Sequence, residues 1–123
     1  MKKILVADDQ FSIAKALSEL LTSAGYDVVL ASDGDMAVEV ALKEKPDLII
    51  MDIMMPKRSG IDAVKAIRMS DELKSAYVIF ISAKGQINEE RGALEAGGNS
   101  LIYKPFSPKK MLQEVSKGLN QEE

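Results

Sequence analysis

Short apolar segments alternate with helical segments along the whole chain, and this alternation restricts the fold more than any other feature. Five runs rich in β-branched and other apolar residues are expected to be strands, at residues 4–7, 28–31, 48–51, 78–81 and 100–103. A segment of helical character follows each of them. Strands that alternate with helices in this way form βαβ units around a parallel sheet. The sequence therefore predicts an α/β, doubly wound fold with helices on both faces of a five-stranded sheet.

Three of the predicted helices carry clear boundary signals. The first has apolar residues at helical spacing and ends at Gly25, which suits a left-handed stop. The second is expected over residues 35–43, with Asp33 nearby as a cap. The last opens with Ser107 as cap and Pro108 at the first helical position.

The fourth helix, expected over residues 86–96, is the weakest of the set. Gly92 lies inside it, at a cost of about 1 kcal/mol relative to alanine, and its apolar face is thin. If one helix shifts during function, we expect it to be this one. A poorly packed surface helix without any role has the same sequence pattern.

Length and net charge limit the classes of partner. The chain has 123 residues, about the size of one ordinary domain, so we expect residues 1–123 to form a single domain. Its formal net charge is −3, which gives no positive field for nucleic acid or an anionic membrane. The first apolar stretch, residues 4–7, is too short for a signal peptide or a membrane span. We therefore expect a cytoplasmic protein without membrane insertion or direct nucleic-acid contact.

Two residue types are missing from the chain, and their absence narrows the chemistry. There is no cysteine, which excludes disulfides, thiolate metal sites and cysteine nucleophiles. There is no histidine either, which removes imidazole as a general base, a metal ligand or a carrier of phosphoryl groups. Carboxylates and lysines must carry any chemistry here.

Functional-looking side chains follow or end four of the five predicted strands. Asp8 and Asp9 end the first strand, Asp52 ends the third, Ser82 ends the fourth and Lys104 follows the fifth. In an open parallel sheet, the carboxyl ends of the strands meet at a crevice where ligands bind. We therefore expect these five side chains to meet in one site.

Three carboxylates in one crevice repel each other. Each pair about 4 Å apart costs roughly 4 kcal/mol at an effective dielectric constant of about 20, so the site requires raised pKa values or a cation. An all-oxygen donor set with room for water favours Mg²⁺ over Ca²⁺. Beside such an ion, Asp52 can attack phosphorus and form an aspartyl phosphate. Lys104 and Ser82 can then stabilise the phosphoryl oxygens.

Several short motifs occur in a fixed order along the chain. They are Asp8-Asp9, Asp52 with Met55-Pro56 and Gly60 behind it, Ser82-Ala83, Ala96-Gly97 and Lys104-Pro105-Phe106. With these motifs the chain resembles, from residue 3 to about residue 119, the receiver domain of two-component response regulators of the single-domain, CheY-like type. The resemblance implies a flavodoxin-like (βα)5 fold with strand order 2-1-3-4-5.

The resemblance also implies roles for individual residues. Asp9, Asp52 and the main-chain carbonyl of Met54 would hold Mg²⁺, and Asp8 would assist through water. Asp52 would be the phosphoacceptor, with Lys104 as a partner aimed into the site by a cis peptide bond to Pro105. Ser82, from its own strand end, would bind the phosphoryl group as well.

The partners implied by the resemblance are a phosphodonor and a protein target. The donor would be a histidine kinase, a histidine phosphotransfer protein or a small acyl or amido phosphate. The chain would catalyse only its own phosphorylation and dephosphorylation, so it is a signalling switch and not an enzyme with a separate substrate. Phosphorylation would change the surface of the fourth helix, fifth strand and last helix, which would then control a downstream protein.

Two positions depart from the family pattern. Leu101 stands where the family usually has an aromatic residue that reports phosphorylation, while Tyr103 lies next to the lysine. We therefore expect the fourth helix and fifth strand to reorganise without an aromatic flip. Met54 and Lys84 flank the expected path of the hydrolytic water. We hypothesise that Met54 hinders this water and prolongs the phosphorylated state.

The same residues admit other interpretations. Phosphatases of the haloacid-dehalogenase type carry an Asp-x-Asp motif whose second aspartate is the general acid, but residue 54 of this chain is methionine, which cannot supply a proton. A flavodoxin-like cofactor binder would place its phosphate beside Asp8 and Asp9, which would repel it. A degenerate receiver used only for docking would lack part of the acceptor site, and no group is missing. Taken singly, each side chain is an ordinary cap, turn residue or solvated lysine.

Overall fold

The computed structural model describes residues 1–83 and 87–120, with the backbone path alone for residues 87–90. Its elements follow one another in the order β1 Lys3–Ala7, α1 Phe11–Ser23, β2 Asp27–Ala31, α2 Gly34–Glu44, β3 Leu48–Asp52, α3 Gly60–Ile67, a 3₁₀ turn Asp71–Leu73, β4 Tyr77–Ala83, α4 Ile87–Glu95, β5 Ser100–Lys104 and α5 Pro108–Leu119. Within these described ranges, no helix has the length and apolar character needed to cross a membrane.

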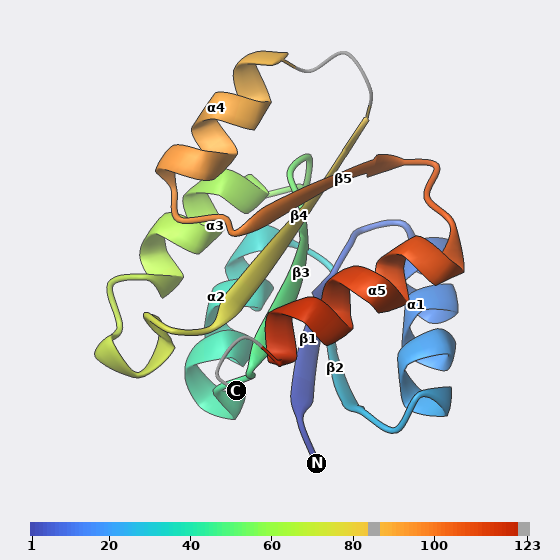
Figure 1. Cartoon of the computed structure of the whole chain (residues 1–123). Coiled ribbons are helices and arrows are strands. Elements are labelled where there is room, and N and C mark those ends of the chain that lie inside the picture. Colours follow the sequence, from blue (N-terminus) through green and yellow to red (C-terminus); the bar gives the residue numbers. More distant parts are fainter. Residues whose placement is uncertain (84–86, 121–123) are drawn as a thin grey trace.

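The five strands form one parallel sheet in the order β2-β1-β3-β4-β5. Helices α1 and α5 cover one face, and α2, α3 and α4 lie on the other (Figure 1). From β1, the chain adds β2 on one side of the sheet and then β3, β4 and β5 on the other side. The connecting helices change face where this order reverses, between β1 and β3. The predicted α/β class, strand order and two-sided helix layers are confirmed.

The core lies on both faces of the three central strands. Every residue of β3 is buried, as are residues 4–7 of β1 and residues 77–82 of β4. On one face, Leu17 of α1 and Met111 of α5 pack against the apolar side chains of these strands. On the other face, Ala41 of α2 and Val64 of α3 do the same. Strands covered on both sides need continuous apolar runs, which explains the runs in the sequence.

The predicted helix boundaries are largely confirmed. Asp33 accepts a hydrogen bond from the Met36 N–H at 2.8 Å, and Ser107 accepts one from the Lys110 N–H at 3.0 Å. Both are side-chain caps of the expected kind. Gly25 follows α1 with φ at +99°, a left-handed conformation that suits glycine.

Some predicted boundaries were wrong by a few residues. Strand β4 runs from Tyr77 to Ala83, so Ser82 is the second-last residue of the strand and not the residue at its end. Lys104, expected just after the fifth strand, is its last residue. Helix α4 begins at Ile87 among the described residues, and the predicted start at residue 86 falls outside them, as does Lys84. Backbone pairing decided these ends, and it leaves little trace in side-chain patterns.

Gly92 has a packing reason inside α4. A Cβ atom at this position would lie 3.2 Å from Cδ1 of Ile61 in α3, which is a tight approach. Ala93 beside it is buried, whereas Leu94 is 64% exposed. The glycine lets α4 lie close to α3, and among residues 91–95 of the helix Ala93 is the buried one.

Candidate functional site

Three carboxylates gather at the carboxyl end of the sheet. Asp52 is the last residue of β3 and Asp8 directly follows β1. These strands are neighbours, with Ala7 opposite Met51, so the two aspartates leave them side by side. Oxygen atoms of Asp8, Asp9 and Asp52 all lie within 4.8 Å of one another. Asp8 and Asp52 are buried and Asp9 is exposed, which leaves the cluster open to solvent on one side.

Asp8 is the least satisfied member of the cluster. Its Oδ1 atom accepts a hydrogen bond from the Gln10 N–H at 2.9 Å. Its Oδ2 atom is buried and forms no hydrogen bond to any described residue; its contact is an ion pair with Lys104 Nζ at 3.5 Å. Burial raises the pKa of the Asp8 carboxyl, and repulsion by Asp52 adds to this, while the Gln10 N–H and Lys104 oppose it.

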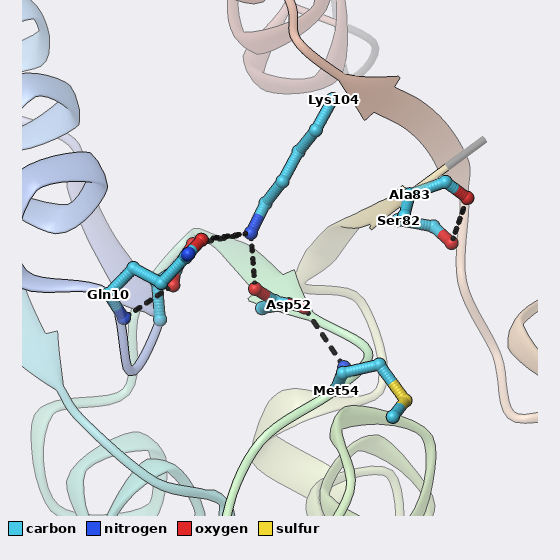
Figure 2. A network of polar contacts seen from close by, with 7 residues as sticks. Gln10, Asp52, Met54, Ser82, Ala83 and Lys104 are labelled. Atoms are coloured by element: carbon cyan, nitrogen blue, oxygen red, sulfur yellow. Dashed lines mark hydrogen bonds and ion pairs between the residues drawn. The ribbon is translucent and has the colours of Figure 1, made fainter.

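Lys104 is the cation that faces this cluster. Its Nζ atom donates to Asp52 Oδ2 at 2.7 Å and to Gln10 Oε1 at 2.9 Å. Figure 2 shows the side chain reaching from β5 between these two partners. The peptide bond from Lys104 to Pro105 is cis, as the resemblance implied. Burial lowers the pKa of Lys104, but the hydrogen bond to Asp52 and the charges of Asp52 and Asp8 outweigh it and raise the pKa overall.

The backbone after β3 completes the surroundings of Asp52. The Met54 N–H donates to Asp52 Oδ1 at 2.9 Å, while the Met54 side chain is 66% exposed (Figure 2). Gly60 packs against the same turn, where a Cβ atom would collide with the Asp52 main-chain carbonyl. Its N–H donates to Ile53 O at 2.8 Å. The glycine behind the strand end therefore lets the loop return close to the carboxylate.

Ser82 is near the site but does not contact the carboxylates. Its side chain is buried, and its Oγ donates to the Ala83 carbonyl at 3.1 Å. In Figure 2 this hydroxyl lies on the far side of β4's end from the Lys104 and Asp52 pair. The structure thus brings Asp8, Asp9, Asp52 and Lys104 together and leaves Ser82 beside them.

The donor set fits a hard divalent cation. Carboxylate oxygens are the ligands that Mg²⁺ prefers, and three of them lie within one ion's reach here. The buried Oδ2 of Asp8, which lacks a hydrogen bond among the described residues, is the atom that such an ion would satisfy. Lys104 balances only part of the negative charge, so the cluster can accept a further cation.

A model of the response regulator receiver domain family matches residues 4–116. The chain belongs to this family. It is therefore a receiver domain of a two-component response regulator, as the motifs indicated.

Curated relatives of this receiver domain are longer regulators. It is 39% identical over 122 residues to the alkaline phosphatase synthesis transcriptional regulatory protein PhoP of Bacillus subtilis (strain 168), covering 99% of this chain and 50% of that protein. It is 38% identical over 113 residues to the transcriptional regulatory protein DltR of Streptococcus agalactiae serotype III (strain NEM316), covering 92% of this chain and 50% of that protein. The chain spans about half the length of these relatives.

Solved structures match the receiver domain over nearly its full length. The chemotaxis response regulator CheY4 of Vibrio cholerae is 33% identical, with a TM-score of 0.91 and coverage of 97% of this chain and 99% of that one. The receiver domain of the sensor histidine kinase PA1611 from Pseudomonas aeruginosa PAO1 is 27% identical, with a TM-score of 0.91 and coverage of 98% of both chains. That structure has a magnesium ion coordinated in its active-site cleft.

Gln10 is a contact residue of the receiver site that the motif analysis missed. Its amide oxygen binds Lys104, a residue 94 positions away in the chain. One signal was available, because glutamine is a poor helix cap and Gln10 stands at the cap position of α1 without a side-chain cap bond. Its true partner could not be inferred, since nothing in the local sequence points to β5.

Proposed function

We propose that this receiver domain is a phosphorylation switch in which Asp52 accepts a phosphoryl group in a Mg²⁺-dependent reaction. The observation that carries the proposal is the position of the Asp52 carboxylate, which is buried between the other acidic side chains and the Lys104 ammonium at 2.7 Å. The donor is a histidine kinase or a histidine phosphotransfer protein, the partners from which receiver domains take phosphate.

The proposed ion site uses the three carboxylates of Asp8, Asp9 and Asp52 together with the main-chain carbonyl of Met54. Bound Mg²⁺ would neutralise the repulsion between the carboxylate nucleophile and the incoming phosphoryl oxygens. The raised pKa of Asp8 supports the proposal, because this carboxylate is short of compensating positive charge in the protein alone.

In the proposed transfer, a carboxylate oxygen of Asp52 forms a bond to phosphorus while the phosphorus–nitrogen bond of the donor's phosphohistidine breaks. The electron pair of that bond leaves with the imidazole nitrogen. Negative charge stays on the phosphoryl oxygens, so the Lys104 ammonium moves from Asp52 toward one of them. Ser82 exchanges its 3.1 Å bond to the Ala83 carbonyl for a bond to another phosphoryl oxygen.

The proposed output is the surface of α4, β5 and α5. Ser82 lies opposite Tyr103 in the pairing of β4 with β5, so a rotation of the serine acts directly on β5. Leu101 is half-buried on that strand and packs toward the α2, α3 and α4 face. This surface is expected to exchange between an inactive and an active conformation. Phosphorylation favours the active conformation only by the difference in free energy with which the two conformations bind the phosphoryl group.

The readout of the switch is a downstream protein. The curated relatives carry the names of transcriptional regulators and have about twice this length. Our expectation of no direct nucleic-acid contact concerns residues 1–123 and rests on their net charge of −3. The single-domain organisation and the cytoplasmic location stay predictions.

Mass spectrometry of the intact protein tests the proposal. After incubation with acetyl phosphate and Mg²⁺, the wild type should gain the mass of one phosphoryl group, and the gain should disappear when EDTA replaces Mg²⁺. Asp52→Asn should show no gain, whereas Asp27→Asn, an exposed aspartate at the start of β2, should behave as the wild type. A mass gain that persists in Asp52→Asn would show that the acceptor has been assigned to the wrong residue.

A further inference from the structure

Gln10 makes a contact that neither helix capping nor the proposed metal site explains. It is the N-cap residue of α1, where serine, threonine, aspartate or asparagine would bond the first free N–H groups of the helix. The Gln10 side chain makes no such bond. Its Oε1 atom instead accepts a hydrogen bond from Lys104 Nζ at 2.9 Å, across the mouth of the site (Figure 2).

The Lys104 ammonium has three protons and, among the described residues, three oxygen partners. They are Asp52 Oδ2 at 2.7 Å, Gln10 Oε1 at 2.9 Å and Asp8 Oδ2 at 3.5 Å. Two of these partners are carboxylates that belong to the acidic cluster. The amide of Gln10 is the neutral one.

The three partners respond differently when the site is used. A cation held by Asp8 and Asp52 would compete with Lys104 for their negative charge. Transfer of a phosphoryl group to Asp52 removes the charge of its carboxylate. The hydrogen bond to Gln10 depends on neither event, because an uncharged amide oxygen is a weak ligand for a hard ion in the presence of carboxylates. It can therefore hold the ammonium while the other two contacts change.

We propose that Gln10 is a positioning residue that holds the Lys104 ammonium at the mouth of the acidic site, ready to move from Asp52 to the arriving phosphoryl group. This inference rests on the proposed function of Asp52. The backbone supports it as well: the Gln10 N–H binds Asp8 Oδ1 at 2.9 Å, and the Gln10 carbonyl accepts from the N–H groups of Ile13 and Ala14 at 3.1 and 3.0 Å. The residue is thus anchored to both the cluster and the first turn of α1.

Gln10→Ser separates positioning from a merely structural role. Serine is a preferred N-cap, so the variant should keep or raise the thermal stability of the protein. The serine side chain is too short to reach Lys104. Gln10→Glu keeps an oxygen acceptor of the same reach but adds a negative charge to the site, so it serves as a rescue for the ordering of Lys104 alone. Ser12→Ala, two residues further along at an exposed position, serves as the control.

The first measurement uses the metal-free protein and needs no activity. Nitrogen-15 NMR of the lysine ammonium groups should detect Lys104 as an ordered, slowly exchanging group in the wild type, in Gln10→Glu and in Ser12→Ala. In Gln10→Ser, its exchange with water should be about tenfold faster, because a hydrogen bond to a charged group is lost. Unchanged exchange in Gln10→Ser would overturn the inference, whatever its effect on stability.

The second measurement is the rate of phosphorylation by acetyl phosphate with Mg²⁺. We expect about a tenfold lower rate constant in Gln10→Ser and no change in Ser12→Ala. A wild-type rate in Gln10→Ser would refute the positioning role and leave the proposed function intact. Failure of the wild type itself to become phosphorylated on Asp52 would refute the proposed function instead, and the NMR result would then decide whether Gln10 orders Lys104.

Discussion

The two ends of the parallel sheet each hold a long cationic side chain, but in opposite surroundings. At the carboxyl end, Lys104 faces charged carboxylates, and one buried oxygen of Asp8 has no hydrogen bond among the described residues. At the amino end, the half-buried guanidinium of Arg68 lies between the segments that enter β4 and β5. Its partners in the described part of the chain are all uncharged oxygens.

The Arg68 guanidinium forms several hydrogen bonds through its two terminal nitrogens. The guanidinium nitrogens donate to four main-chain carbonyls and one side-chain amide, namely Leu73 O at 2.8 Å, Lys74 O at 3.1 Å, Ala76 O at 2.7 Å, Gly97 O at 2.7 Å and Asn99 Oδ1 at 3.0 Å. Asn99 Oδ1 also accepts from the Val78 N–H at 2.8 Å. Burial lowers the pKa of Arg68, yet an arginine remains charged in a protein. One side chain therefore joins the end of α3 to the starts of two strands.

The difference separates a stabilising site from a reactive one. The Arg68 network pairs one cation with uncharged oxygens and contains no like-charge repulsion among its described partners. The acidic cluster keeps repulsion and, among the described residues, an oxygen without a hydrogen bond, and a bound cation would relieve both. Functional sites commonly retain such unfavourable features, and the rest of the fold must compensate for them.

The largest effect on stability is expected at the amino end. Arg68→Met should lower the free energy of unfolding by about 3 kcal/mol, because several carbonyls lose their partner together. Chemical denaturation measures this. Arg58→Met is the matched control, since the Arg58 side chain is 38% exposed and pairs with Asp35 at 3.0 Å, so its loss should cost far less stability. Equal losses in both variants would remove the contrast between the two ends.

At the carboxyl end, we expect a substitution to raise the stability of the protein. Asp8→Asn should raise the free energy of unfolding of the metal-free protein by about 1 kcal/mol, because it removes a buried charge and the repulsion between that charge and Asp52. Solvent near Asp9 screens part of this repulsion, which keeps the increase in stability small. The asparagine Oδ1 can keep the bond to the Gln10 N–H. Asp9→Asn, at the exposed member of the cluster, should change stability much less. A less stable Asp8→Asn would show that the cluster supports the fold.

The acidic cluster should also set a pH dependence. The pKa of Asp8 is raised above its ordinary 3.8 in the fold, so between these two values the folded state binds more protons than the unfolded state. The metal-free protein should therefore lose stability as the pH rises through this window, and Asp8→Asn should abolish that loss. Because the ion needs ionised carboxylates, Mg²⁺ should bind more weakly at pH 5 than at pH 7. Denaturation at several pH values, with and without Mg²⁺, tests the predicted loss of stability at rising pH and the predicted weaker Mg²⁺ binding at low pH.

The smallest effect on stability is expected at Met54. Its side chain is 66% exposed, so Met54→Asn should leave the free energy of unfolding unchanged. If the methionine hinders the hydrolytic water, the variant should lose its phosphoryl group about fivefold faster. The decay of the phosphorylated protein after removal of the donor measures this. An unchanged decay rate would show that Met54 does not protect the phosphate.

Local patterns predicted most of the fold. The caps Asp33 and Ser107 and the stop at Gly25 are decided by neighbours within a few residues, so they could be identified from the sequence. The acidic cluster could be predicted too, because parallel strands bring their carboxyl ends to one edge. The 3₁₀ turn Asp71–Leu73 was not predicted. The ends of β4 were not predicted either, since they depend on backbone pairing with neighbouring strands.

The sequence by itself determined that five βα units bring their strand ends to one acidic edge, because apolar periodicity and the residues that follow each strand are properties of segments. Only the tertiary structure decided which side chains touch: at that edge, that Ser82 bonds to Ala83 and Gln10 to Lys104, and at the opposite end of the sheet, that Arg68 joins two strand starts. Such contacts join residues as many as 94 positions apart at distances near 3 Å. Their geometry is set by the packing of the whole sheet and its helices, which local patterns do not encode.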